Sequence, residues 1–535
     1  MESSRQPYAT ARSATGLTAL SVLSPLVGLV VEIALAWRFG ASATVDAFRV
    51  GSLLIFFGQQ IFIFQILPNV IVPVFAEHRA RGEEQEAWHI SFSLAHLFLL
   101  PTVLLSLFLF VSPSVIVHFL GPGLVGEARD SATLFVRWFA LAYIPLVWSG
   151  VVAGVLYAYR IFWLPTASQL LSNVFLVIII LVFGRWLGPV SLVLGMLLAS
   201  VGAGVLYAVR LVPLVRQLRV HYSFRIHAGV RKTFHFALPL LGTLILVQWG
   251  GIIVNRVLSE LPAGTLATFG YAWKMGQIVS LLPTALATVL FPRFAESWHS
   301  SQEEFRQVCT SALRMALFIA IPLTCICFFL RVSLVAILFQ RGKFSIEAGE
   351  RVARIFALLL LGAPAYVTYI YLEKMLYAVQ EMRVPTYAAA ASALFLTATA
   401  PVVVRFGAGA VAVVVAVLNW LTAGGVLFIL CWKYKAVRMK EMGIFVMGIL
   451  LLAVAAAWIG GEGGRALGQF IGSRTLSPGL TLAGSTSLAA IIFYGLTLLL
   501  RLPEACQGQR YLRWQSDAII RGVQSAIQRI EGLFA

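Results

Sequence analysis

Ionisable and amide side chains inside strongly apolar segments are the groups of this chain that could do chemistry. The apolar stretch 51–77 carries Gln59 and Gln65, an earlier stretch carries Glu32, and a later one carries Lys274. An ionisable group at bilayer depth is costly unless it faces a partner or water, so such residues are functional candidates. Glu32 and Lys274 could instead form a structural ion pair with each other, or reach toward the membrane interface.

Helical spacing gathers polar and small residues on one face of the segment that contains them. Gly51, Gly58 and Gln65 fall on one stripe of a helix, and Gln59 lies on its flank. Small residues on such a stripe suit close helix packing, whereas the amides favour the wall of a wet cavity. Asp46 begins this segment, where it could also cap a helix or carry a rim charge. We predict that five residues line a substrate path: Glu32, Asp46, Gln59, Gln65 and Lys274.

The sequence offers no recognisable set of catalytic residues. Its eight histidines are scattered, and no serine or cysteine nucleophile or phosphate-binding glycine loop stands in a known motif. The five cysteines have neither the spacing of a metal site nor that of a disulfide framework. We therefore expect a transporter rather than an enzyme, with no cofactor and no metal. The membrane potential, an ion gradient or the substrate gradient would supply the energy.

Composition predicts the elements that position these residues. The chain has 535 residues, of which 60% are hydrophobic and only 12% charged, far from the usage of soluble proteins. The long apolar runs do not alternate as barrel strands do, so the predicted fold is all-α and polytopic. Fourteen membrane helices are expected near 16–38, 46–75, 90–111, 131–158, 162–184, 188–209, 233–257, 264–291, 308–330, 352–377, 385–404, 410–431, 442–460 and 481–500.

The net charge of +18 indicates topology rather than nucleic-acid binding. If the N-terminus is inside, most lysines and arginines fall in the loops and tails of that same side. By the positive-inside rule, both termini are predicted to be cytoplasmic. The basic residues would attract the anionic head groups of membrane lipids, and no nucleic-acid partner is expected.

An internal repeat predicts two pseudo-symmetric lobes. Pro73, Phe75, Ala76 and Glu77 recur 219 residues later in the same order, on the far side of a basic stretch. Transporter repeats commonly place the substrate path at their interface. The predicted units are an N-terminal lobe (1–209), a basic cytoplasmic linker (210–232), a C-terminal lobe (233–431), two additional helices (432–501) and a cytoplasmic amphipathic tail (502–535).

Three motifs carry a family resemblance. They are "WRFGASATVDAFRVGSLL" with the later "VPVFAE", then "YAWKMGQIVSLLPTALATVLFPRFAE", and "ILFQRGKF". They resemble the MurJ/MviN family, the lipid II flippases of the multidrug/oligosaccharidyl-lipid/polysaccharide exporter superfamily. The resemblance implies a two-lobed, fourteen-helix protein. It would carry an undecaprenyl-pyrophosphate-linked glycan, lipid II or a related precursor, across the cytoplasmic membrane by alternating access.

The resemblance also assigns roles to single positions. Asp46 corresponds to the family's essential aspartate, and Lys274 to an arginine of a cationic cavity. Three further family arginines fall at Pro25, Val31 and Gln59, so this chain has lost cations there. An amide at such a position can hydrogen-bond sugar hydroxyls instead of gripping phosphate oxygens.

Other classes of function stay open at this stage. A multidrug or cation antiporter of the same superfamily could use Glu32 as its coupling carboxylate. A polyprenyl-phosphate glycosyltransferase would need a carboxylate or metal cluster on a large loop. A scaffold without transport could recruit cell-wall synthesis proteins, which are also candidate partners of a flippase.

Overall fold

The computed structural model describes residues 6–60, 66–159, 161, 163–217, 229–471 and 477–499. Nearly all of this part of the chain is helical, and it contains no strand. The all-α prediction is therefore confirmed. In hydrocarbon the backbone must satisfy its own hydrogen bonds, and a helix does so within one segment, which is why long apolar runs take this form.

The helices form two groups. The first group packs mainly within itself, and α1 also contacts α11 of the second. Its members are α1 (Gln6–Phe39), α2 (Ala43–Gln59), α3 (Ile66–Ala80), α4 (Glu84–Val111), α5 (Pro113–Leu120), α6 (Glu127–Ala140), α7 (Tyr143–Ala158), α8 (Trp163–Leu187) and α9 (Val190–Gln217).

The second group begins with α10 and includes an outer pair, α18 and α19, that packs on α12. Its members are α10 (Gly229–Ser259), α11 (Thr265–Ser300), α12 (Gln302–Phe329), α13 (Arg331–Phe339), α14 (Ile346–Leu360), α15 (Ala363–Ala378), α16 (Arg383–Val403), the 3-10 turn η2 (Val404–Phe406), α17 (Gly407–Tyr434), α18 (Met439–Ile471) and α19 (Ser477–Leu499).

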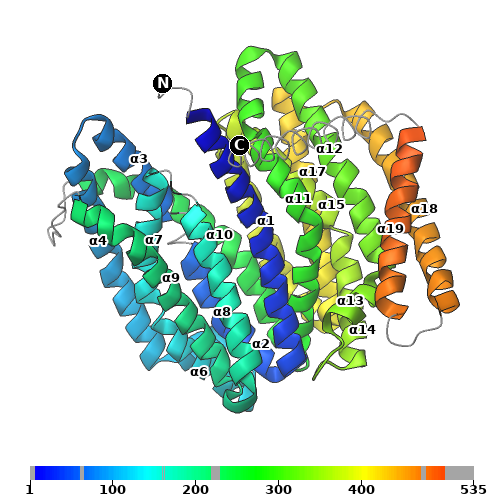
Figure 1. Cartoon of the computed structure of the whole chain (residues 1–535), viewed down its shortest axis with the longest axis horizontal. Helices are drawn as coiled ribbons and strands as arrows, with labels where there is room; N and C mark the ends of the chain where they lie inside the picture. Colours follow the sequence, from blue (N-terminus) through cyan, green and yellow to red (C-terminus); the bar gives the residue numbers. More distant parts are fainter. Residues whose placement is uncertain are drawn as a thin grey trace, which may run out of the picture.

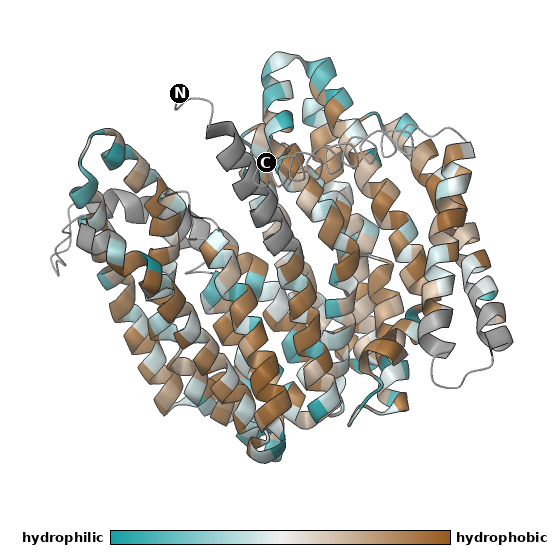
Figure 2. Ribbon diagram, in the orientation of Figure 1, coloured by the Kyte–Doolittle hydropathy of each residue, from teal (hydrophilic) through white to brown (hydrophobic). Residues whose placement is uncertain are grey.

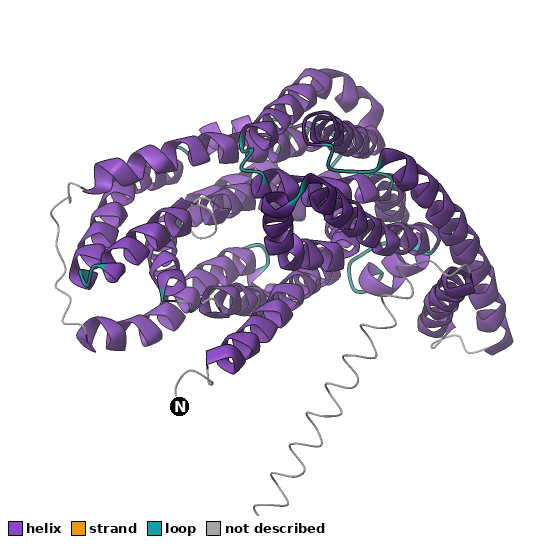
Figure 3. Ribbon diagram, turned by 90° about the horizontal axis from the view of Figure 1, so that it is seen from above, coloured by secondary structure: helices purple, strands orange, loops and turns teal. Residues whose placement is uncertain are grey.

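The two groups converge at one end of the molecule, at the bottom of Figure 1. The turn between α1 and α2, the start of α11 and the α13–α14 turn lie together there. We call this end of the molecule the gate end. From above, Figure 3 shows many helices joined by short loops and no strand in the described part of the chain. The gate end is therefore where residues far apart in the sequence come into contact.

Hydrophobic residues are spread along the helices (Figure 2), and many of the large ones are exposed. Trp186 and Ile444, from different groups, keep 75% and 78% of their surface exposed. Seven helical stretches are long and apolar enough to cross a membrane, or nine if two bent pairs count as single spans, within the described residues. The chain thus has the exterior of a multi-pass membrane protein, while the count of fourteen spans stays a prediction.

Two predicted spans differ from the structure in shape. The span expected at 46–75 is described as α2 and α3, with residues 61–65 between them outside the described part, so its continuity stays a prediction. The segments 131–158 and 352–377 each contain two helices, bent by 46° and 45°. Pro364 stands in the first turn of α15, where its missing N–H and fixed φ favour the start of a new helix.

The predicted linker overlaps the ends of two helices. Residues 210–217 belong to α9, and residues 229–232 to α10. Positions 218–228 and the predicted amphipathic tail lie outside the residues that the structure describes. The lobe boundaries drawn from the sequence therefore stay predictions.

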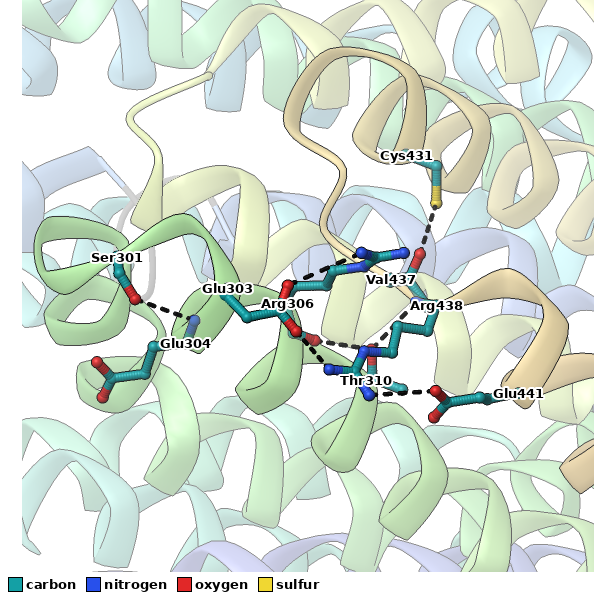
Figure 4. A network of polar contacts seen from close by, with 9 residues as sticks. All are labelled: Ser301, Glu303, Glu304, Arg306, Thr310, Cys431, Val437, Arg438 and Glu441. Atoms are coloured by element: carbon teal, nitrogen blue, oxygen red, sulfur yellow. Dashed lines mark hydrogen bonds and ion pairs between the residues drawn. The ribbon is translucent and has the colours of Figure 1, made fainter.

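A polar cluster joins the outer helix pair to the rest of the second group (Figure 4). The backbone N–H of Arg438, in the α17–α18 turn, donates to Thr310 Oγ1 of α12 over 3.2 Å. The Arg438 guanidinium donates to Glu303 of α12, and over 3.1 Å to Glu441 of α18. This side chain therefore connects three segments through hydrogen bonds.

We predict that Arg438→Ala loosens this connection without unfolding the protein. The cluster is solvent-exposed, so the change in Tm of the detergent-solubilised protein should be a few degrees at most. Proteolysis should accelerate at the α17–α18 turn, which mass spectrometry of the fragments would locate. An unchanged cleavage pattern would contradict a tethering role for Arg438.

Candidate substrate cavity

Asp46 joins the two groups of helices at the gate end. Its carboxylate, only 3% exposed, accepts hydrogen bonds from the backbone N–H groups of Gly264 (2.5 Å) and Ala267 (2.7 Å). These N–H groups belong to the N-terminus of α11, where helical partners are missing. A carboxylate there also stabilises the positive end of the helix dipole. Asp46 therefore caps a helix of the other group, not its own.

Further contacts close the same end. Tyr271 of α11 donates its hydroxyl proton to the carbonyl of Gly40 over 2.9 Å, and the N–H of Lys343 donates to the carbonyl of Trp37 over 3.0 Å. Gly264 has a φ of +86° and lies against the backbone of Ala41, so a side chain there would meet both strain and contact. The gate end is thus held by backbone groups, the Tyr271 hydroxyl and one buried carboxylate.

A cavity of about 390 Å³ lies between the helices beside this closed end. Side chains of α1, α2, α7, α8, α9 and α11 line it. Its polar members are Ser24, Glu32, Arg49, Ser52, Gln59, Ser149, Ser168, Gln169, Ser172, Asn173, Ser200, Tyr207, Lys274 and Gln277. Such a mixture of charged and neutral polar groups suits a large ligand with distinct parts.

The carboxylate of Glu32 is paired with Arg49. Arg49 Nη2 lies 2.6 Å from Glu32 Oε2, and Nη1 lies 3.4 Å from Oε1, so the guanidinium approaches both oxygens. The expected Glu32–Lys274 ion pair is wrong, because Arg49 on the adjacent helix presents two nitrogens to the carboxylate. The Arg49 guanidinium also lies 5.1 Å from the ring centre of Tyr271, which brings α11 into this contact.

Lys274 is the second cation of the cavity. It makes no ion pair within 4 Å among the residues that the structure describes. A Cβ atom on Gly28 of α1 would lie 3.0 Å from Lys274 Nζ, so the ammonium group reaches across to the first helix. This leaves its hydrogen-bond donors available to an anionic ligand.

The five predicted site residues fall into three places. Glu32, Gln59 and Lys274 line the cavity together. Asp46 lies at the gate, outside the lining. Gln65 lies outside the described residues. Their part in substrate binding stays a prediction.

Sequence reasoning missed Arg49, Gln169 and Asn173 as cavity residues. Arg49 stands three positions after Asp46, one turn further along α2, and could pass for a rim charge. Gln169 and Asn173 are four residues apart in an apolar run, so their shared face on α8 was a usable signal. What no spacing gives is which helices meet around them.

Fold and site together define a class of protein: a multi-pass membrane transporter with a polar cavity between two groups of helices. A family model described as "Lipid II flippase MurJ" matches residues 35–470. The chain belongs to this family, which confirms the resemblance noted in the sequence.

Relatives agree along most of the chain. A lipid II flippase MurJ from Burkholderia cenocepacia is 25% identical over 390 residues, covering 70% of this chain and 74% of the relative. A probable lipid II flippase MurJ from Thermotoga maritima is 24% identical over 450 residues, covering 82% and 90%. These relatives are named as flippases, not as enzymes.

Solved structures show the same fold. "Lipid II flippase MurJ, inward closed conformation" superposes with a TM-score of 0.76 at 18% identity, covering 90% of this chain and 99% of the other. An inward-facing multidrug resistance MATE transporter superposes with a TM-score of 0.64 at 13% identity, covering 78% and 98%. The two-group architecture is thus shared with both kinds of transporter.

We predict that Asp46→Ala opens the gate end. Two buried N–H groups of α11 would lose their acceptor, at a cost of about 1–2 kcal/mol. The population with the gate open should rise about 5- to 30-fold. Spin labels on Thr44→Cys and Ser345→Cys, in a background without native cysteines, would report the separation across the gate by pulsed electron paramagnetic resonance.

Asp46→Asn is the matched control for this prediction, because an amide oxygen keeps one acceptor. It should lengthen the label separation less than Asp46→Ala does. Identical distance distributions in all three proteins would contradict the capping role.

Proposed function

We propose that this chain translocates lipid II, the undecaprenyl-pyrophosphate-linked precursor of peptidoglycan, across the cytoplasmic membrane of a bacterium. The observation that carries the proposal is the cavity of a MurJ-family chain in which Lys274 and Arg49 face amides and hydroxyls. Cations suit a pyrophosphate and neutral polar groups suit sugars. The substrate crosses unchanged, so no catalytic residues are required.

Alternating access explains the gate. With both termini in the cytoplasm, the α1–α2 turn lies outside, and the capped end of α11 closes the cavity toward the periplasm. Breaking the Asp46 hydrogen bonds while the opposite end closes would expose the same cavity to the outer leaflet. Only a few hydrogen bonds hold the gate end closed. The states with this end closed and open therefore differ by a small free energy, and the substrate or the membrane potential can shift the balance between them.

Phosphate recognition in this chain would rest on two cations, Arg49 and Lys274. The family arginine positions Pro25, Val31 and Gln59 all line the cavity but carry no charge. Arg49 enters from α2 and Lys274 from α11. We propose that Lys274 binds the pyrophosphate directly, and that Arg49 shares its guanidinium between Glu32 and the substrate.

Family membership argues against the antiporter reading, although multidrug transporters share the fold. A scaffold without transport is separated from a flippase by the experiment below. Contact with cell-wall synthesis proteins stays a prediction from the resemblance.

We predict that this chain restores growth to a Gram-negative host depleted of its own lipid II flippase. Lipid II would become accessible on the outer leaflet, as measured by a periplasmic enzyme or label that modifies it. Failure despite good membrane expression would overturn lipid II as the substrate.

Lys274→Ala should abolish this rescue. It removes a charge-assisted hydrogen bond worth about 1.5–3 kcal/mol, which is about 10- to 100-fold in affinity. Lys274→Arg should retain rescue, because the guanidinium keeps the charge. Lys374→Ala, which removes a lysine of α15 outside the lining, is the matched control. Full activity of Lys274→Ala would refute this role.

A further inference from the structure

The part of the cavity lining that comes from α7, α8 and α9 differs in chemistry from the part that comes from α1, α2 and α11. Its polar members, called here the neutral wall, are Ser149, Ser168, Gln169, Ser172, Asn173, Ser200 and Tyr207. None of the lining residues from these helices is charged, whereas α1, α2 and α11 contribute Glu32, Arg49 and Lys274. The cavity therefore has a charged side and an uncharged polar side.

Four of the five hydroxyl groups of the neutral wall, those of Ser168, Ser172, Ser200 and Tyr207, make hydrogen bonds within the protein. Ser172 donates to the carbonyl of Ser168 over 2.9 Å, and Ser200 donates to that of Met196 over 3.0 Å. Ser168 and Tyr207 share a hydrogen bond of 2.7 Å. With these protons used inside the protein, the serine oxygens present mainly acceptor lone pairs to the cavity.

The two amides of the neutral wall are without partners. Gln169 and Asn173 follow each other by one turn of α8 and make no side-chain hydrogen bond with the residues that the structure describes. Each offers two N–H donors and one acceptor oxygen. Amides left unpaired inside a membrane protein are costly unless water or a ligand satisfies them.

Donors and acceptors without charge match the hydroxyl and acetamido groups of a sugar. The peptide part of a precursor carries carboxylates, which would find no cation on this wall. A sugar hydroxyl both donates and accepts, and so can bond an amide and a serine oxygen at once. The wall therefore discriminates by chemistry between the uncharged and the charged parts of the substrate.

The two walls meet at Gly28 of α1. A Cβ atom there would lie 3.0 Å from Lys274 Nζ and 3.9 Å from Asn173 Nδ2, so the ammonium and the amide approach one point from opposite groups of helices. In a lipid-linked glycan the first sugar is bonded directly to the pyrophosphate. The Lys274 ammonium and the Asn173 amide lie side by side in the same way, as a pyrophosphate and its first sugar would require.

We propose that the neutral wall is the sugar subsite of the cavity, with Gln169 and Asn173 as its specificity-determining residues and Lys274 marking the adjoining pyrophosphate position. This inference rests on the proposed function. It adds that the neutral wall of α7, α8 and α9 recognises the glycan, while the charged side recognises the pyrophosphate that every such carrier shares.

Binding of three probes to the detergent-solubilised full chain, measured by native mass spectrometry, tests this assignment. The probes are undecaprenyl pyrophosphate, the same carrier with a disaccharide, and lipid II. The double variant Gln169→Leu/Asn173→Leu should raise Kd about 10- to 30-fold for both sugar-bearing probes and leave the bare carrier unchanged. Lys274→Ala should weaken all three. Asn255→Leu, which removes an amide of α10 outside the lining, should change none.

The unchanged affinity for the bare carrier also reports that the double variant is folded. Equal weakening of all three probes, or of none, would overturn the sugar subsite. Weakening confined to lipid II would assign the wall to the peptide and likewise overturn it. If the wild-type chain binds no probe, the proposed function fails together with this inference, whereas wild-type binding with an unaffected double variant rejects the subsite alone.

Discussion

The hydrogen bonds from the N-terminus of α11 to the carboxylate of Asp46 are the constraint on which the arrangement of the two helix groups depends. A helix start buried in a membrane protein leaves N–H groups that need acceptors. Here the acceptor comes from a helix more than 200 residues earlier, so satisfying the backbone of one group requires the other to be in place. When the gate end closes, the free N–H groups at the start of α11 gain their acceptor.

The cavity beside this gate gains its character from what Arg49 does. Arg49 pairs with Glu32 and so offsets the negative charge of that carboxylate in the cavity. Arg49 also lies against Tyr271, and so connects α1, α2 and α11. An anion entering the cavity would compete with Glu32 for the same guanidinium. We propose that Arg49 thereby couples substrate binding to the stability of the gate, since a transporter can use binding energy to shift between states.

The internal repeat places equivalent residues at buried positions of both helix groups. Phe75 and Phe294, its matching aromatic residues, are both fully buried, in α3 and α11. In the second group the matching segment lies in one helix, α11, which runs from Thr265 to Ser300. In the first group the matching segment comprises α2 and α3, and residues 61–65 between them lie outside the described part of the chain.

The sequence by itself determined the all-helical membrane fold, since long apolar runs leave no other way to satisfy the backbone. It also predicted Glu32, Gln59 and Lys274 as residues of a polar path, because polar groups are costly in such apolar runs, and all three line the cavity. Only the tertiary structure decided which residues come into contact. It pairs Glu32 with Arg49 and Asp46 with the start of α11, and it places Asn173 near Lys274. These choices depend on which helices pack together and at what rotation, and helical periodicity fixes a face without naming the helix opposite it.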